Sequence, residues 1–317
     1  MIPADIRRAI ERAVSEAAGR EIRVTRAARV GGGCISPAAR VEFEARPPAF
    51  VKWAEPGRAP LDLFTREAES LSAIGAANAV RVPRVEAVAA RWLLLEWIEP
   101  GRPSERGWRA LGAQLAGLHR SGGERDREPG GRSGRGFGWP RDNYIGSLPQ
   151  QNGRLEDWAA FWRDRRLVPQ LERAYAAGHF DGSDRRRFTQ LLRELETIIG
   201  GAARADGRSL VHGDLWNGNV HFAADGEPVL IDPAAYVGHR EVDLAMAELF
   251  GGFSSDFFAA YGQTWPLEPD YAPRRRATYQ LYYLLVHVNL FGSGYVAGAR
   301  SARERALGEH RTGHTWG

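Results

Sequence analysis

Hydrophobic and polar positions in the first part of the chain follow two spacings. Short apolar runs, several of them alternating with polar residues, are typical of strands. They predict strands at residues 22–30, 38–45, 49–54, 84–90 and 91–98. Apolar positions at helical spacing predict a helix at 3–18 and a second one at 59–77, between the third and fourth strands. The expected arrangement is a small antiparallel sheet with one inserted helix.

The pattern turns helical after "EPGRPS", residues 99–104, where glycine and proline interrupt regular structure. The predicted helices lie at 104–122, 155–177, 183–200 and over most of the chain after Glu241. A glycine-rich stretch at 122–153 is expected to be a long loop. Three short apolar runs predict strands at 209–213, 219–223 and 228–232.

These patterns divide the chain into two parts. A length of 317 residues exceeds that of a usual single domain. The turn-rich stretch is the best boundary, so we expect an N-terminal lobe at 1–98, a C-terminal lobe at 99–317 and a hinge at about 96–103. The expected fold class is α+β, with a small lobe built on a sheet and a larger, mainly helical lobe.

Three consecutive glycines, Gly31, Gly32 and Gly33, separate the first two predicted strands and precede Cys34, the only cysteine of the chain. Glycines between strands usually form an ordinary turn. They also allow backbone N–H groups to approach phosphate oxygens, because no Cβ stands in the way. The stretch on its own leaves both interpretations open.

The basic residues of the chain are 42 arginines and a single lysine, Lys52. Lys52 lies in the predicted strand at 49–54, where a compact ammonium can serve as a point charge in a place too narrow for a guanidinium. The alternative is an ordinary surface lysine. Composition alone is compatible with both.

Charge and hydropathy bear on the binding partners and on the cellular location of the protein. The net charge of +4 permits anionic partners, and "GGRSGRG" at 130–136 resembles RNA-binding segments, but acidic residues are interleaved with the basic ones. The N-terminus predicts an amphipathic helix and not a signal peptide. The most apolar stretch, 279–299, is interrupted by Gln280, His287 and Asn289. One cysteine forms no internal disulfide, so we expect a cytoplasmic protein. Because of the interleaved charges and the interrupted apolar stretch, we also expect that it binds neither nucleic acid nor membranes.

The most informative polar residues lie between 210 and 245. An apolar strand leads into His212-Gly213-Asp214, Asn219 follows five positions after Asp214, and Asp232 ends a later apolar run. Carboxylate and amide oxygens in this arrangement suit Mg²⁺ that is held together with phosphates. The spacing of Asp214 and Asn219 also matches a kinase catalytic loop, in which the aspartate accepts the proton of the substrate hydroxyl.

Two other interpretations apply to the same stretch. His212, Asp214 and His221 could bind a hydrolytic metal ion. However, the two histidines are expected on different segments, and no helix carries the H-x-x-x-H pattern. Asp, Asn and Gly also mark ordinary turns, but a turn does not explain why these positions occur together with a glycine loop and a single lysine. We therefore favour the interpretation as a magnesium and phosphate site.

Several segments resemble the fructosamine kinases, also called ketosamine 3-kinases, which belong to the protein-kinase-like superfamily together with the aminoglycoside phosphotransferases. The resemblance runs from about residue 20 to 298 and is carried by "LVHGDLWNGNV" and "IDPAAYVGHREVDLAMAELFGGFSSDFFAAY". "HGDxxxxN" and "IDP" are shared across the superfamily, whereas "GGGCIS", "DNYIGSLPQ" and "LFGGFSS" are narrower signals. The resemblance implies a two-lobed protein-kinase-like fold.

The resemblance also implies roles for individual residues. Asp214 matches the catalytic base, and Asn219 and Asp232 match the positions that hold the metal ion. Lys52 matches the lysine that contacts the nucleotide phosphates, and Glu67 matches the helix glutamate that pairs with it. All nucleotide-binding positions that the resemblance implies are Gly31, Gly32, Gly33, Cys34, Lys52, Glu67, Glu96, Trp97 and Ile98.

Two further polar residues are expected to be structural. Asp243 matches an aspartate that braces the catalytic loop in the superfamily. His119 lies in a predicted helix, and such a histidine is more often hydrogen-bonded there than catalytic.

The activity that the resemblance implies is transfer of phosphate from ATP, with Mg²⁺, to the 3-hydroxyl of a ketoamine sugar such as a fructosamine or ribulosamine on an amine or protein. The product would then decompose and release the amine, which is deglycation. One alternative is a kinase for an aminoglycoside or choline, although polycationic acceptors favour an acidic cleft and this chain has an excess of arginine. A second is a non-catalytic nucleotide- or RNA-binding protein. The expected assembly is a monomer or a redox-sensitive dimer through Cys34.

The chain departs from the protein-kinase pattern at two places. Ser36 stands where G-x-G-x-x-G requires its third glycine, and Pro233-Ala234 follow Asp232 where protein kinases have Phe-Gly. We therefore expect neither an activation loop switched by phosphorylation nor activity on protein serine or threonine.

Overall fold

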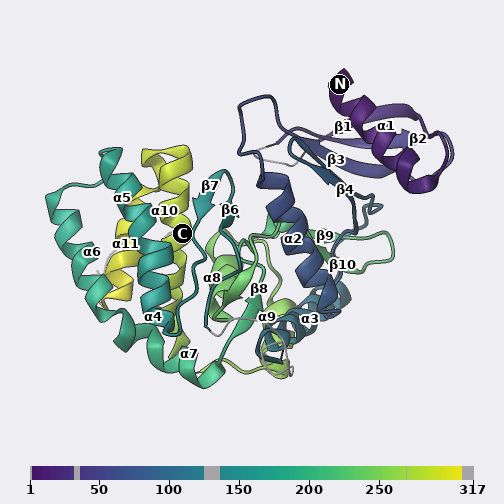
Figure 1. The fold of residues 1–317 in the computed structure, drawn as a ribbon. Coiled ribbons are helices and arrows are strands. Elements are labelled where there is room, and N and C mark those ends of the chain that lie inside the picture. Colours follow the sequence, from purple (N-terminus) through teal and green to yellow (C-terminus); the bar gives the residue numbers. More distant parts are fainter. Residues whose placement is uncertain (1, 32–35, 125–135, 269, 309–317) are drawn as a thin grey trace.

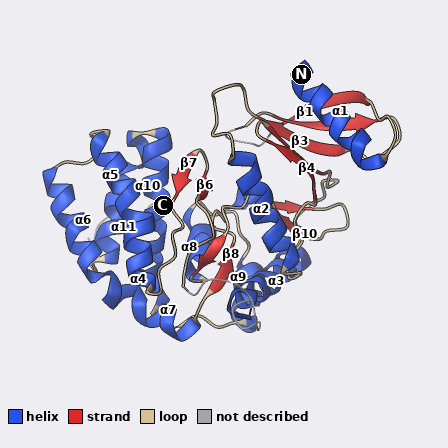
Figure 2. Ribbon diagram, viewed as in Figure 1, coloured by secondary structure: helices blue, strands red, loops and turns tan. Residues whose placement is uncertain are grey.

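The computed structural model describes residues 2–31, 36–124, 136–268 and 270–308. Figure 1 shows a smaller part, which contains the N-terminus and a sheet, beside a larger part built mainly from helices. Figure 2 shows the same division, with a sheet in the smaller part and mainly helices, with a few short strands, in the larger part. The α+β class and the two-part arrangement expected from the sequence are therefore present.

The smaller part is a five-stranded antiparallel sheet with two helices. The strand order is β1-β2-β3-β5-β4. The strands are β1 (Val24–Val30), β2 (Ala38–Phe43), β3 (Ala49–Trp53), β4 (Val85–Ala89) and β5 (Trp92–Glu96), and the helices are α1 (Ala4–Ala18) and α2 (Leu63–Ala76). The inserted helix α2 begins four residues later than predicted, after a turn that contains Pro60.

The two helices cover opposite faces of the sheet, because successive residues of a strand point to opposite sides. Ile6 and Ile10 of α1 pack with Val51 and Leu94. Phe64 and Leu71 of α2 pack instead with Leu93 and Leu95, the neighbours of Leu94 on β5. The residue after Val51 is Lys52, so the same alternation turns Lys52 toward α2.

The larger part is mainly helical. Its helices are α3 (Glu105–Glu124), α4 (Trp158–Phe161), α5 (Val168–Ala176), α6 (Gly182–Leu195), α7 (Gly201–Asp206), α8 (Glu241–Leu249), α9 (Ser255–Thr264), α10 (Arg276–Phe291) and α11 (Val296–Ala306). Wider helical turns at 162–167 and 196–200 join α4 to α5 and α6 to α7, so each pair forms one continuous helix.

The larger part also contains three short pairs of antiparallel strands. They are β6 (Asn143–Ile145) with β7 (Leu148–Gln150), β8 (Ser209–Val211) with β11 (Tyr236–Gly238), and β9 (Val220–Phe222) with β10 (Pro228–Leu230). The prediction of one long loop at 122–153 was therefore wrong for its second half. The inward residues of the β6–β7 hairpin include Asn143 and Gln150, which are buried but polar. The hydrophobic pattern therefore did not reveal these two strands.

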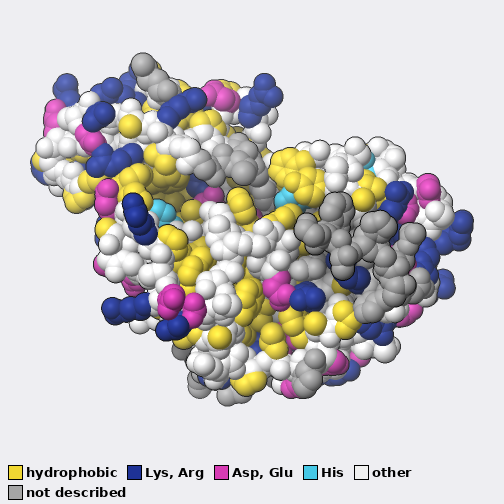
Figure 3. Space-filling model, turned by 180° about the vertical axis from the view of Figure 1, so that it is seen from behind, with side chains coloured by type: hydrophobic (Ala, Val, Ile, Leu, Met, Phe, Trp, Pro, Cys, Tyr) yellow, Lys and Arg dark blue, Asp and Glu magenta, His cyan; other side chains and the backbone are white. Residues whose placement is uncertain are grey.

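The surface has a mixed distribution of charge. Figure 3 shows basic and acidic side chains interspersed over the face seen from behind. No helix in the described part of the chain has both the length and the apolar character needed to cross a membrane.

Candidate active site

The single lysine is buried between three elements. Its side chain is only 9% exposed, and its Nζ lies 2.6 Å from Glu67 Oε1 on α2 and 2.8 Å from Asp232 Oδ1, just after β10. The interpretation of Lys52 as an ordinary surface residue is therefore excluded. The ion pair with Glu67 that the family resemblance implies is present.

The segment that carries Asp214 bends sharply after β8. Gly213 has a φ of +82°, a left-handed conformation that favours glycine, and an added Cβ would lie 2.2 Å from the carbonyl oxygen of Ala234. The Ala234 N–H in turn donates to the His212 carbonyl at 3.0 Å. The chain thus passes close to the backbone that follows Asp232, which brings Asp214 and Asp232 to one place.

Asp243 holds this bend from below. It is fully buried, and its two carboxylate oxygens accept the N–H groups of His212 (2.7 Å) and Gly213 (2.9 Å). His119 Nε2 also lies 3.0 Å from Asp243, and its Nδ1 lies 2.8 Å from the Tyr261 hydroxyl. Both residues have the hydrogen-bonded surroundings of structural groups, and burial lowers the pKa of His119, which favours a neutral ring.

Asn219 is oriented by Asp214. Its Nδ2 donates to the Asp214 carbonyl at 2.8 Å and to the carboxylate Oδ2 at 3.3 Å. The amide oxygen of Asn219 therefore points away from Asp214. Asp232 has an unusual positive φ of +54° and uses one oxygen for Lys52. The oxygens of Asn219 and Asp232 that these contacts leave over are hard ligands of the kind that Mg²⁺ prefers.

Two adjoining cavities meet at these residues. One, of about 150 Å³, is lined by Lys52, Glu67, Asp214, Asn219 and Asp232. The other, of about 310 Å³, lies toward the connection between the two parts. Its walls include Gly31, Glu96, Trp97, Ile98 and also Asp232. The predicted catalytic and metal-binding residues therefore line one cavity, the predicted hinge residues line the other, and Asp232 lines both.

The side chains of Glu96, Trp97 and Ile98, at the predicted hinge, are held by local contacts. Glu96 accepts from Arg81 at 2.9 Å, and the Trp97 indole N–H donates to Glu99 at 2.7 Å. Ile98 is buried against Ala223 and Val229 of the larger part. Of the predicted glycine loop, Gly31 lines the larger cavity, whereas Gly32, Gly33 and Cys34 lie outside the described residues.

The charges in the smaller cavity perturb one another. Burial raises the pKa of Asp214 to about 7, and the neighbouring charge of Asp232 adds to the rise. Burial alone would lower the pKa of Lys52, but the charges of Asp232 and Glu67 outweigh burial and raise it. Burial raises the pKa of Glu67, while the Lys52 ammonium opposes that rise. The cavity holds an excess of carboxylates, which suits a cation.

The alternative of a hydrolytic metal ion finds no support among the predicted histidines. The His212 ring lies 2.9 Å from the Ile231 carbonyl through Nε2 and accepts the Asp214 N–H through Nδ1 at 3.3 Å. Both ring nitrogens are thus occupied. His221 lines the larger cavity and not the one that contains Asp214.

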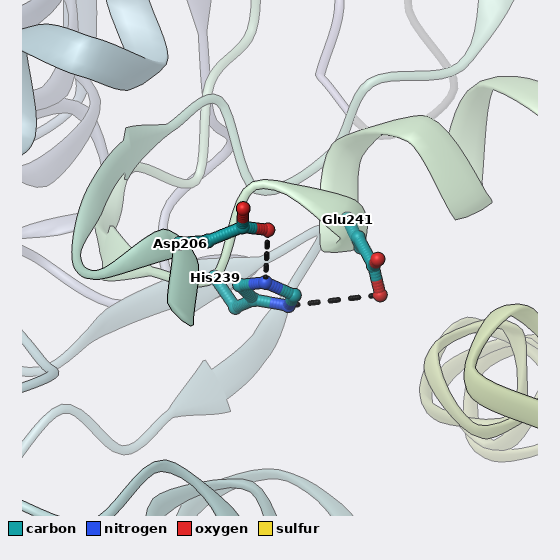
Figure 4. A group of neighbouring side chains, drawn as sticks. All are labelled: Asp206, His239 and Glu241. Carbon is teal, nitrogen blue, oxygen red and sulfur yellow. Dashed lines mark hydrogen bonds and ion pairs between the residues drawn. The ribbon is translucent and has the colours of Figure 1, made fainter. Parts of the chain in front are cut away.

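A different group, Asp206, His239 and Glu241, has metal-like spacing (Figure 4). Its carboxylates are already neutralised. Asp206 accepts two bonds from Arg240, and Glu241 accepts a bidentate pair from Arg275. His239 uses its ring nitrogens for Asp206 (2.9 Å) and the Tyr279 hydroxyl (2.8 Å). This group is a buried ion-pair network that ties α7 to α8.

Several residues of the smaller cavity were not predicted. Its walls also include Asn143, Tyr144 and Gly146 of the β6–β7 hairpin, Arg66 of α2, and Trp216, which lies between Asp214 and Asn219. The signal for the hairpin was the stretch "DNYIGSLPQ", which resembled the family without pointing to a site residue.

The fold and the cavity define the class of protein. A small antiparallel sheet with a buried lysine paired to a helix glutamate, above a helical part that presents Asp214, Asn219 and Asp232, is the arrangement of protein-kinase-like phosphotransferases. The protein is a kinase of this two-lobed class.

The comparisons with known proteins narrow the class to a family. A sequence model of the fructosamine kinase family matches residues 6–309. A probable ketoamine kinase from Synechocystis sp. is 37% identical over 304 residues, which cover 94% of this chain and 96% of that protein. The chloroplastic protein-ribulosamine 3-kinase of Oryza sativa subsp. indica is 35% identical over 288 residues, which cover 89% and 79%.

Structural comparison agrees with these relatives. A crystal structure from Thermobifida fusca, described as that of a fructosamine-3-kinase, superposes with a TM-score of 0.81 at 34% identity and covers 94% of this chain and 98% of that one. The chain belongs to the fructosamine kinase family.

Proposed function

We propose that the protein transfers the terminal phosphoryl group of ATP to the 3-hydroxyl of a ketoamine sugar attached to an amine or a protein. The observation that carries this proposal is the convergence of Asp214, Asn219, Asp232 and the Lys52–Glu67 pair on one cavity, in a chain of the fructosamine kinase family. The rice relative is named a protein-ribulosamine 3-kinase, which supports a ketoamine as the acceptor.

The nucleotide would lie across the two adjoining cavities. The adenine would occupy the larger one, against the backbone of Glu96, Trp97 and Ile98, and we propose residues 96–103 as the hinge between lobes at 1–98 and 99–317. The triphosphate would then extend toward Lys52, with the N–H groups of Gly31, Gly32 and Gly33 and the loop around Cys34 beside it. Glu67 would hold the ammonium in place.

Asn219 and Asp232 fit the magnesium ion that such a reaction uses. The fit rests on the donor set, because the Asn219 amide nitrogen is committed to Asp214 and leaves its oxygen available beside the second oxygen of Asp232. When bound, Mg²⁺ supplies neutralisation of the charge on the phosphate oxygens.

Asp214 would act as the base. Its carboxylate lines the cavity and would accept the proton of the 3-hydroxyl as the oxygen attacks the phosphorus. The bond between the terminal phosphorus and the bridging oxygen breaks, and ADP leaves. The family resemblance implies that the ketoamine 3-phosphate then decomposes and frees the amine, so the physiological role would be deglycation.

The test is to incubate the protein with Mg-ATP and separate acceptors, namely a ribulosamine, a fructosamine, an aminoglycoside and choline, and to measure ADP release against a blank without acceptor. We expect release with one or both ketoamines and none above the blank with the others. ADP release that is greatest with the aminoglycoside or choline would overturn the proposal. A redox-sensitive dimer through Cys34 and a cytoplasmic location remain predictions from the sequence.

A further inference from the structure

The β6–β7 hairpin has two faces with different partners. Residues of a strand alternate, so Asn143 and Ile145 of β6 and Leu148 and Gln150 of β7 point into the larger part, whereas Tyr144 points the other way. The hairpin lies beside α2 in Figure 1 and contacts it. It therefore has contacts with both the helical part and the helix that carries Glu67.

The inward face is fixed to the backbone that follows Asp232. Asn143 Nδ2 donates to the Ala235 carbonyl at 3.0 Å, and Gln150 Nε2 donates to the Ala234 carbonyl at 3.1 Å. Gln150 Nε2 also donates to Asn143 Oδ1 at 2.8 Å, and its own oxygen accepts the Tyr282 hydroxyl at 2.9 Å. Since both amides are nearly fully buried, any unpaired atom would be costly and the geometry is strongly specified.

The base of the hairpin is held by a buried arginine. Arg166 is fully buried, donates to Asn152 Oδ1 at 2.8 Å, and has its guanidinium 4.0 Å from the ring centre of Tyr236 and 4.7 Å from that of Phe161. In the described part of the chain no carboxylate pairs with it, so the aromatic faces and carbonyl groups balance its charge. These contacts attach this end of the hairpin to the helical part.

The outward face reaches the start of α2. The Tyr144 hydroxyl donates to Asp62 Oδ1 at 2.6 Å, and the other oxygen of Asp62 accepts Arg66 Nε at 2.9 Å. Asp62 directly precedes α2, and Glu67 follows on the second turn, where it pairs with Lys52. The Tyr144–Asp62 bond is charge-assisted, which makes it stronger than a neutral hydrogen bond.

We propose that the hairpin is a strut between the two lobes, and that Tyr144 is its positioning residue, holding α2 so that Glu67 keeps Lys52 beside Asp232. In protein kinases the corresponding helix is positioned by the activation loop that follows the Asp-Phe-Gly segment. Here Pro233-Ala234 follow Asp232, and the Ala234 carbonyl binds the hairpin instead. The strut thus holds α2 in place permanently, whereas in protein kinases the position of this helix depends on phosphorylation. This role rests on the proposed kinase function.

The test compares Tyr144→Phe with Tyr175→Phe. The first change removes only the hydroxyl that reaches Asp62 and keeps the ring in the cavity wall. Tyr175 is a matched control, because it lies on α5 and stacks on Arg185 without a hydrogen bond from its hydroxyl in the described structure. We expect kcat of Tyr144→Phe to fall about tenfold, with faster hydrogen exchange in α2 and an unchanged melting temperature. The control should match the wild type in all three.

A double-mutant cycle separates the bond from other effects. If Tyr144 acts through Asp62, the variant Tyr144→Phe/Asp62→Asn should be no slower than the slower single variant. Wild-type kcat and wild-type exchange in Tyr144→Phe would overturn the strut. A lower kcat without faster exchange in α2 would also overturn it, because Tyr144 would then act on the substrate directly. Since exchange is measured without an acceptor, it judges the strut even if no ketoamine is phosphorylated.

Discussion

Replacing Gly213 by alanine tests the close approach that brings Asp214 to Asp232. The chain offers a matched control, because Gly226, in the turn between β9 and β10, has a φ of +83° against +82° for Gly213. An added Cβ at Gly226 meets nothing within 4 Å, whereas at Gly213 it would lie 2.2 Å from the Ala234 carbonyl oxygen. The two variants therefore share the backbone strain and differ in the collision.

The difference in stability follows from this geometry. A left-handed alanine costs about 1–2 kcal/mol, and the smaller entropy of the unfolded chain offsets about 0.4–1 kcal/mol of that, so Gly226→Ala should lose about 1 kcal/mol. In Gly213→Ala the Ala234 carbonyl must move by about 1 Å, which disturbs its bond from Gln150 and the bond from Ala234 N–H to His212. At about 1–3 kcal/mol for each of these two buried groups if left unpaired, the further loss is about 2–6 kcal/mol.

The assay is urea unfolding followed by tryptophan fluorescence, together with kcat on a ketoamine. A displacement of about 1 Å at a reacting group can cost about 100-fold in rate, so kcat of Gly213→Ala should fall about 100-fold while that of Gly226→Ala stays within about twofold. Equal unfolding free energies and equal kcat values in the two variants would refute the reasoning.

Four further predictions concern single residues. Asp214→Asn should lower kcat by about 10²–10⁴-fold, the usual value of a general base, with nearly unchanged nucleotide binding in a titration; more than about a third of wild-type turnover would contradict the role. Lys52→Arg should lower kcat/KM for ATP about tenfold or more although it keeps the charge, because the buried site between two carboxylates is shaped for an ammonium; an unchanged value would contradict this. The hydrogen bonds from Arg300 lower the pKa of buried Asp184 to about 2, so the native carboxylate contributes about 2 kcal/mol. That contribution is complete above pH 4 and is lost as the pH falls toward 2, so the difference in unfolding free energy between wild type and Asp184→Asn should shrink from pH 7 to pH 3, and a difference independent of pH would be the contrary result. Mild peroxide should give a dimer on non-reducing gels that Mg-ATP suppresses and Cys34→Ala abolishes; a monomer throughout would oppose the redox dimer.

The side of the sheet on which Lys52 lies could be predicted from the sequence, because two independent signals coincide at this residue. One is its rarity among arginines, and the other is its place in a strand whose neighbours Val51 and Trp53 are apolar. Alternation then places Lys52 on the face opposite to those neighbours, where α2 packs. That Asp214, Asn219 and Asp232 lie close together was equally predictable, since all three lie near the ends of short strands that are close in sequence.

The β6–β7 hairpin could not be predicted in the same way. Sequence patterns identify a buried face by its apolar residues, but here Asn143 and Gln150 occupy inward positions and are 3% and 1% exposed. Their burial is stable only because carbonyl groups more than 80 residues away accept their N–H groups. Local sequence contains the two amides and not their partners, so the predicted loop was the reasonable but wrong conclusion.

Asp243 shows why the type of a distant polar side chain matters, because only a carboxylate can accept all the donors that surround it. Its oxygens accept three donors, from the His212 and Gly213 main chain and from His119, while the Gly213 carbonyl accepts the Tyr283 hydroxyl at 2.9 Å. The main-chain N–H groups of His212 and Gly213 and the Gly213 carbonyl are therefore all hydrogen-bonded, and the Asp214 side chain lines the cavity. An amide in place of Asp243 would direct N–H against N–H in a site without water access, at the cost of at least one unpaired buried donor. A carboxylate is thus the side chain of this size that satisfies the bend, although it never reaches the reacting atoms.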